Sequence, residues 1–224
     1  WDVDKTLTRL AHQDEIRPAI VVAVWMAHWN KGARGAEYMP RKAVTDTLWQ
    51  RMREAGPGTA TGGFACEEGG QTLTSDNYLK FLVAELKPFI DATYLTLPDR
   101  EDTFLMGSSM GGLISAYAIA EYPEMFGGAA CLSTHWPMGF GAVVQWFDDH
   151  WPVAGSNRLY FDYGTETLDA QYEPYQQQMD TVMRKYGYTE GKDWVTRRFA
   201  GEEHSPQAWR ERLHIPLAFL LGIQ

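Results

Sequence analysis

The segment GSSMG at residues 107–111 places a serine at the centre of a G-x-S-x-G motif. In serine hydrolases this motif forms a sharp turn between a strand and a helix, so that the serine hydroxyl stands clear of the sheet. The apolar run TFLM precedes the motif and small residues follow it, as such a turn requires. Ser109 is therefore the predicted nucleophile, and the backbone N–H of Met110 is the predicted oxyanion donor. A Cβ at Gly107 or Gly111 is expected to collide where strand and helix cross.

A serine hydroxyl needs a base within hydrogen-bond reach, and the chain order in this arrangement is Ser, then acid, then His. His204 follows the last predicted strand and precedes the final helix, which makes it the predicted base. The acid is expected just after the strand RLYFD. Glu166 is favoured over the alternative Asp169, because Asp169 is well placed to cap a helix beginning at Ala170. Asp162 is a third choice.

The elements that must position these residues alternate along the chain as short apolar runs and helical patterns, which is typical of α/β proteins. Strands are predicted at residues 19–25, 103–106, 128–132, 158–162 and 194–199. Helices are predicted at residues 1–15, from Ser75 to a kink or end at Pro88, at 113–122, along the apolar stripe 172–186, and from Ser205-Pro206 onward. Residues 56–70 are too rich in glycine for an element and predict a surface loop over the site. The sequence predicts one α/β domain over residues 1–224.

Several segments of the chain resemble the putative-esterase (esterase D-like) family of α/β-hydrolases, which includes enterochelin, feruloyl and acetylxylan esterases. They are IRPAIVVAV, EYMP, SDNYLKFLVAELKPFID, MGSSMGGLISAYA, STHWP, FDYGTETLDAQY and AGEEHSPQAW. The resemblance implies an α/β-hydrolase fold, with a mostly parallel sheet flanked by helices. It also implies Ser109 as nucleophile and His204 as base, and it leaves the acid open between Asp and Glu.

One feature of that family has no counterpart upstream of Ile16. Its members usually carry one more strand, which comes earlier in the chain. In the sheet this strand lies between strand 19–25 and the strand before the elbow, and the turn at its end supplies the second oxyanion donor. Because the chain begins with Trp1 rather than Met, we expect the natural protein to extend further N-terminally. The chain then lacks N-terminal strands of the fold.

Residues that follow the strands are candidates for substrate contact, because ligands bind α/β sheets at the carboxyl ends of the strands. These candidates are Trp136, His135 and Asn30, and the family resemblance of EYMP adds Tyr38. Aromatic side chains stack on sugars or aromatic acids, so the expected substrate is a small-molecule or carbohydrate ester. Two alternatives to an esterase are an acyltransferase of the same fold and a catalytically silent interaction module.

Composition excludes other classes of function. A net charge of −9 argues against a nucleic-acid partner. No apolar stretch approaches the ~18 residues of a membrane-spanning helix. The histidines and cysteines have no metal-site spacing and no phosphate loop is present, so no metal or cofactor is expected. Cys66 and Cys131 are expected to be free thiols, since two cysteines make no disulfide framework. Neither an oligomeric state nor a compartment is predicted.

Overall fold

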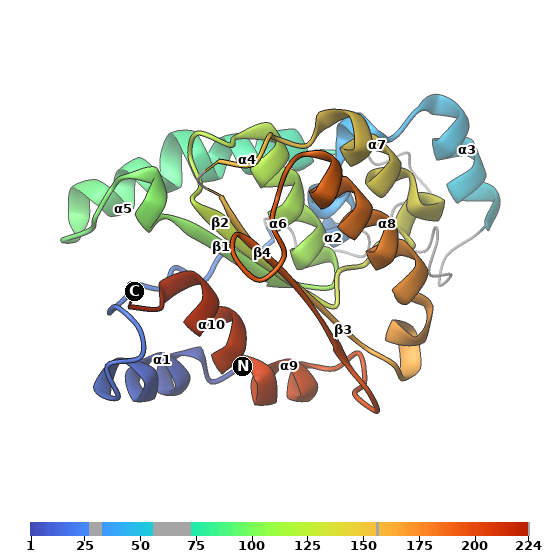
Figure 1. Cartoon of the computed structure of the whole chain (residues 1–224). Helices are drawn as coiled ribbons and strands as arrows, with labels where there is room; N and C mark the ends of the chain where they lie inside the picture. Colours follow the sequence, from blue (N-terminus) through green and yellow to red (C-terminus); the bar gives the residue numbers. More distant parts are fainter. Residues whose placement is uncertain (27–32, 56–72, 156, 224) are drawn as a thin grey trace.

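The computed structural model of the chain describes residues 1–26, 33–55, 73–155 and 157–223. Its centre is a parallel sheet of four strands in the order β1-β2-β3-β4, shown in Figure 1. The strands are β1 (Phe104–Ser108), β2 (Gly128–Leu132), β3 (Arg158–Gly164) and β4 (Trp194–Phe199). All four were predicted, and β2 and β4 have the predicted bounds.

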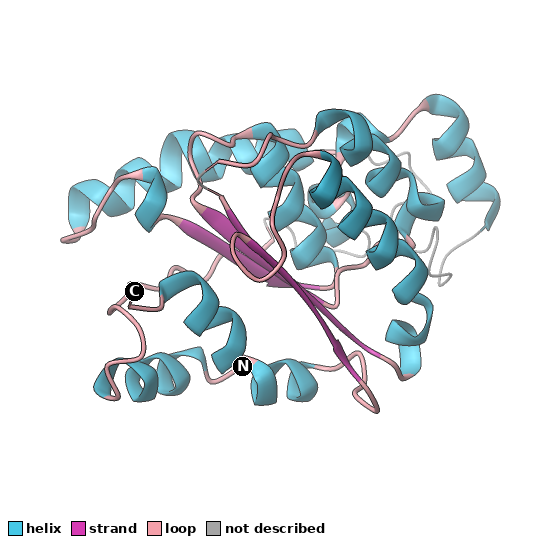
Figure 2. Cartoon of the chain, in the orientation of Figure 1, coloured by secondary structure: helices cyan, strands magenta, loops and turns pink. Residues whose placement is uncertain are grey.

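Helices cover both faces of this sheet, as Figure 2 shows. On one side lie α2 (Ala33–Tyr38), α3 (Asp46–Ala55), α4 (Ser75–Phe81), α5 (Lys87–Thr93), α6 (Met110–Glu121), α7 (Ala142–His150) and α8 (Glu173–Lys185). On the other side lie α1 (Val3–His12), α9 (Pro206–Arg212) and α10 (His214–Leu221). Five short turns connect them, namely η1 (Arg41–Ala43), η2 (Leu82–Leu86), η3 (Arg100–Asp102), η4 (Met138–Gly141) and η5 (Thr167–Gln171).

The strand β2 is buried along its whole length, because helices cover it on both faces. Ala129 and Cys131 belong to the large core beneath α6, whereas Ala130 and Leu132 belong to a smaller core beneath α10. This alternation is the two-residue period of a strand. Cys131 is a free thiol, as predicted, and Cys66 lies outside the described residues.

The strand predicted at residues 19–25 is absent, and that prediction was wrong. Residues 19–25 belong to no strand of the described sheet, and Ile20, Val21 and Val22 are 52%, 54% and 40% exposed. Just upstream, the chain is held by an isolated bridge between Ile16 and Gly222. Apolar and β-branched residues form a strand only where a neighbouring edge pairs with them. Here β1 pairs with β2 alone and leaves its other edge open in the described sheet.

Two predicted helix boundaries differ in outcome. Pro88 was expected to kink or end its helix, but α4 continues through the π-helical turn η2 into α5, with Pro88 in the first turn of α5. The π turn falls where proline lacks the N–H that an α-helix would use. The start of the last helical region is as predicted, because the Ser205 hydroxyl accepts the N–H of Ala208 at 3.2 Å and caps α9.

Neither a membrane span nor a metal cluster is present in the part of the chain that the structure describes. No helix there is long and apolar enough to cross a bilayer. No group of three or more His, Cys, Asp or Glu side chains is arranged there to hold a metal ion.

Candidate active site

Ser109 stands between the end of β1 and the start of α6, in the strand–turn–helix context that the sequence predicted. Its backbone angles, φ 56° and ψ −123°, are strained for a residue with a Cβ. Hydrogen bonds hold this conformation: Ser109 N donates to Leu132 O at 2.9 Å, and Ser109 O accepts from His135 N at 3.2 Å. Met110 is the first residue of α6, so its N–H has no acceptor within the helix. The positive end of the α6 dipole lies at the same point.

The glycines beside Ser109 are not equivalent. A Cβ at Gly107 would lie 2.4 Å from the backbone carbonyl of Gly111, so strand and helix cross there as closely as predicted. A Cβ at Gly111 meets nothing within 4 Å, and the collision predicted at Gly111 was therefore wrong. The closer approach on the helix is at Gly112, where a Cβ would lie 2.8 Å from Oγ1 of Thr134.

This difference predicts opposite effects of two alanine substitutions. Gly107→Ala is expected to lower the free energy of unfolding by about 2 kcal/mol or more, and Tm by about 4–8 °C, because backbone atoms must move. Gly111→Ala is expected to leave Tm unchanged or to raise it, since alanine favours the helix. Thermal denaturation of both variants checks this. Equal losses in both would contradict the crossing described here.

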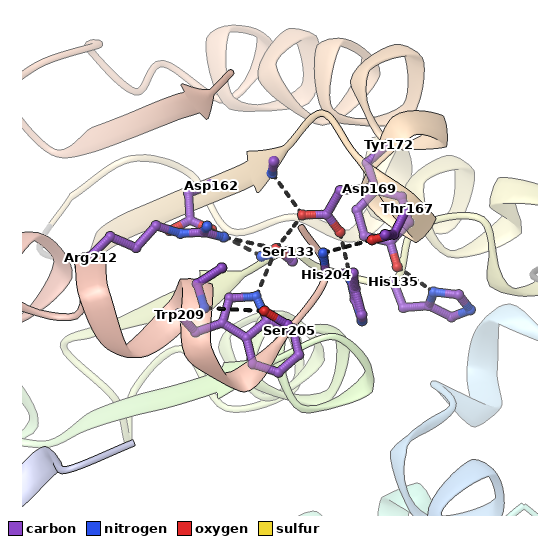
Figure 3. Close-up of polar contacts among 12 residues, drawn as sticks. Ser133, His135, Asp162, Thr167, Asp169, Tyr172, His204, Ser205, Trp209 and Arg212 are labelled. Atoms are coloured by element: carbon purple, nitrogen blue, oxygen red, sulfur yellow. Dashed lines mark hydrogen bonds and ion pairs between the residues drawn. The ribbon is translucent and has the colours of Figure 1, made fainter. Parts of the chain in front are cut away.

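His204 and Asp169 form a hydrogen-bonded pair, drawn in Figure 3, in which the side chain of His204 is partly exposed. Nδ1 of His204 lies 2.5 Å from Oδ1 of Asp169, which is fully buried. The other carboxylate oxygen accepts the hydroxyl of Ser133 at 2.6 Å and the N–H of Gly164 at 2.7 Å. Burial raises the pKa of Asp169, but the hydrogen bonds from His204, Ser133 and Gly164 outweigh that effect. The pKa of Asp169 is therefore below its ordinary value, and the carboxylate is ionised at neutral pH. An ionised carboxylate only accepts, so Nδ1 carries the proton and Nε2 keeps a free lone pair.

The structure corrects the preference for Glu166 as the partner of His204. Glu166 is exposed, and among the described residues its carboxylate has one hydrogen bond, accepted from the hydroxyl of Thr165 at 3.2 Å. Asp169 was set aside as a helix cap, but α8 begins later, at Glu173. Asp169 lies instead in η5, a turn that brings its carboxylate back to the end of β3. Asp162, the third choice, is paired with Arg212 at 3.0 Å.

Tyr172 interacts with both Ser109 and His204. Burial raises its pKa, and a side-chain hydrogen bond to Ser109 opposes that rise. Its ring is edge-on to the ring of His204, with centroids 5.6 Å apart, and its hydroxyl is 2.6 Å from Nδ1 of His135. Sequence reasoning missed Tyr172 because it begins an apolar stripe attributed to the core. A buried phenol needs a polar partner, and that requirement is the signal that was available.

The predicted substrate contacts have different outcomes. Trp136 is 1% exposed and donates its N–H to Gln176 at 2.8 Å, so it belongs to the core and its prediction as a substrate contact was wrong. His135 is equally buried and contacts Tyr172. Tyr38 is half-buried, with its ring 5.2 Å from that of Tyr78. Asn30 and the predicted loop 56–70 lie outside the described residues.

Arg34 is a further candidate for the site, and the sequence did not reveal it. It lies on α2 and is half-buried. Burial lowers its pKa, while electrostatic interactions with Tyr38 and Tyr172 raise it. An arginine stays charged in proteins, so Arg34 brings a positive charge near the tyrosine that contacts Ser109. No motif or spacing in the sequence distinguishes this arginine from one on the surface.

Comparison with known proteins gives the family. The family model described as "Putative esterase" matches residues 1–214. The chain belongs to this esterase family. Membership supports ester hydrolysis as the chemistry of the fold. No curated protein sequence matches the chain significantly.

Solved structures of esterases share the fold. The enterochelin esterase from Shigella flexneri is 18% identical with a TM-score of 0.66, over 96% of this chain and 45% of that one. A ferulic acid esterase is 17% identical with a TM-score of 0.62, over 98% and 76%. The enterobactin hydrolase IroE, in complex with DFP, is 15% identical with a TM-score of 0.63, over 97% and 75%. The α/β-hydrolase prediction is thereby confirmed. The chain spans less than half the length of the enterochelin esterase.

Proposed function

We propose that this chain is a serine esterase, which hydrolyses a carboxylic ester through an acyl-serine intermediate. The observation that carries the proposal is the hydrogen bond between the buried Asp169 and His204, with Tyr172 contacting both His204 and the strained Ser109. A nucleophile, a base and a group that orients the base are the three parts that covalent acyl transfer needs. Membership of an esterase family supports the same chemistry.

In the first half of this reaction Ser109 attacks the ester carbonyl while Nε2 of His204 takes the hydroxyl proton. The negative charge that develops on the carbonyl oxygen is stabilised by the N–H of Met110 and the dipole of α6. Asp169 stabilises the imidazolium and fixes its orientation. His204 then gives the proton to the leaving alcohol, and the acyl group stays on Ser109.

In the second half a water molecule attacks the acyl-serine. His204 takes the proton of that water and returns one to the Ser109 oxygen as the acid leaves, so the protein is regenerated. Arg34 and Tyr38 border the site with a cation and a phenol, which favours a substrate rich in oxygen, such as an acylated carbohydrate or an ester of a hydroxylated aromatic acid.

Turnover of p-nitrophenyl acetate and p-nitrophenyl butyrate tests this proposal. We expect release of nitrophenol with one equivalent of free carboxylic acid. A parallel reaction with added glucose or glycerol separates hydrolysis from acyl transfer, because a transferase would give an acylated alcohol in place of the acid. Absence of turnover with either ester, in a folded protein, would contradict the esterase assignment.

A further inference from the structure

Ser133 occupies an unusual place between the acid and the helix that follows the base. It comes directly after β2, is fully buried, and has φ 40°, in the left-handed region that costs energy for a residue with a Cβ. Its backbone N–H is held by Asp162, through the carbonyl at 2.9 Å and Oδ1 at 3.1 Å. Figure 3 shows its side chain at the meeting point of Asp169, Trp209 and Arg212.

The hydrogen bonds that the Ser133 hydroxyl accepts determine where it donates its own proton. Nε1 of Trp209 and Nη2 of Arg212 each lie 2.9 Å from Ser133 Oγ. Indole and guanidinium groups only donate, so both use lone pairs of the hydroxyl oxygen. A serine hydroxyl has one proton and two lone pairs, and its proton is therefore left for Oδ2 of Asp169, at 2.6 Å.

We propose that Ser133 is a positioning residue of the triad, whose hydroxyl is oriented by Trp209 and Arg212 so that it holds one oxygen of Asp169 and leaves the other for His204. This inference rests on the proposed function. The carboxylate oxygen that faces Ser133 also accepts the N–H of Gly164. Both of these hydrogen bonds are to Oδ2, and Oδ1 is the oxygen that contacts His204.

Arg212 forms an ion pair with Asp162, and this pair orients the N–H that Arg212 donates to Ser133. Arg212 is 4% exposed and makes two hydrogen bonds to the buried Asp162, at 3.0 and 3.1 Å. The hydroxyl of Tyr160 also donates to that carboxylate, at 3.1 Å. Such a buried, hydrogen-bonded pair keeps the guanidinium in one orientation. The N–H aimed at Ser133 is therefore fixed.

The helix α9 couples this network to the base. It begins immediately after His204 and Ser205, and it carries Trp209 and Arg212 three residues apart, on one face. The ring of Trp209 also stands edge-on to the ring of His204, with centroids 5.0 Å apart. The groups facing His204 are thus Asp169 from η5, Tyr172 ahead of α8 and Trp209 from α9.

Ser133→Ala tests the proposal. Without this donor the Asp169 charge is less dispersed and stabilises the imidazolium more, so the NMR titration midpoint of His204 is expected to move to higher pH. The looser carboxylate is expected to lower kcat for p-nitrophenyl acetate by about 10- to 100-fold, the range for a hydrogen bond to a charged group. KM is expected to stay nearly the same, since Ser133 touches no substrate.

Two further variants give controls. Trp209→Phe keeps a ring beside His204 but removes one donor to Ser133, so a smaller shift in the same direction is expected, and it serves if Ser133→Ala does not fold. Ser75→Ala removes an equally buried serine, whose hydroxyl accepts the N–H of Arg41 at 3.0 Å, and should leave the midpoint unchanged.

An unchanged His204 midpoint in both Ser133→Ala and Trp209→Phe would overturn the positioning role, even if Tm fell. The titration uses no substrate, so it also separates this inference from the proposed function. A shifted midpoint in a protein that hydrolyses no ester would support the positioning role and refute the esterase.

Discussion

Ser109→Ala is expected to lower kcat for p-nitrophenyl acetate by about 10⁶-fold, the largest loss of any single substitution in this chain. In the proposed mechanism the hydroxyl of Ser109 forms the covalent bond to the acyl group, and no other group in that turn replaces it. The variant should fold as the parent does, since alanine carries the same Cβ at φ 56°. Initial rates at saturating ester measure the loss, and circular dichroism confirms the fold.

Ser108→Ala is the matched control for that substitution. Ser108 is the adjacent serine and is 9% exposed, against 7% for Ser109, but it is the last residue of β1 and not part of the turn. Its activity should stay within about tenfold of the parent, because it takes no part in the chemistry. A large loss in Ser108→Ala with activity kept in Ser109→Ala would move the nucleophile and contradict the elbow described here.

Asp169→Asn is expected to lower kcat by about 10⁴-fold while leaving the fold intact. The reason lies in the donors around the carboxylate. The hydroxyl of Ser133 and the N–H of Gly164 both point at one oxygen position, so the amide oxygen must take that place. The amide NH₂ then faces His204, whose Nδ1 must become an acceptor. The proton moves to Nε2, and His204 no longer accepts the proton of Ser109.

Glu166→Gln is the control for the acid. The Glu166 side chain is exposed and accepts a hydrogen bond from the neighbouring Thr165, so activity is expected to stay within about twofold of the parent. Each of the two variants changes one carboxylate to an amide, and the two positions are three residues apart. Both variants are measured in the same assay. A larger loss in Glu166→Gln than in Asp169→Asn would restore the assignment that the geometry overturned.

The same carboxylate predicts how stability depends on pH. The folded pKa of Asp169 lies below its ordinary value, so its charged form stabilises the fold above about pH 4, and this stabilisation is lost as pH falls through the folded pKa. Denaturant unfolding should therefore show a larger deficit for Asp169→Asn at pH 7 than at pH 3. A deficit that is the same at both values would contradict an ionised, hydrogen-bonded Asp169.

The elements around the elbow could be predicted because local signals and the fold agree there. The strand β2 is a run of small and apolar residues with helices on both faces, and its predicted bounds were right. Ser205 and Pro206 predict the start of α9, because a capping serine followed by proline is a local signal. Residues 19–25 carry an equally strong strand signal, but a strand also needs a paired edge. That partner is a property of the tertiary structure and cannot be read from the segment itself.

The prediction of Glu166 as the partner of His204 was wrong for a related reason. Asp169 and Glu166 stand three residues apart in a short segment, and only the fold of η5 decides which of them returns to β3. The role inferred for Ser133 depends on donors from α9, 76 and 79 residues further along the chain. Arg34 and Tyr172 likewise come together from α2 and the start of α8. Contacts between residues so far apart in the chain follow no fixed spacing, so a single sequence does not reveal them.

Covalent labelling with a fluorophosphonate tests whether Ser109 is the nucleophile. The folded chain would be treated with the reagent, digested and mapped by mass spectrometry, with fragment ions that separate Ser108 from Ser109. We expect one phosphonyl group per chain, on Ser109, and labelling that becomes much slower in His204→Ala and disappears in Ser109→Ala. Ester hydrolysis by a chain that stays unlabelled at Ser109, or that is labelled at another residue, would contradict this role of Ser109.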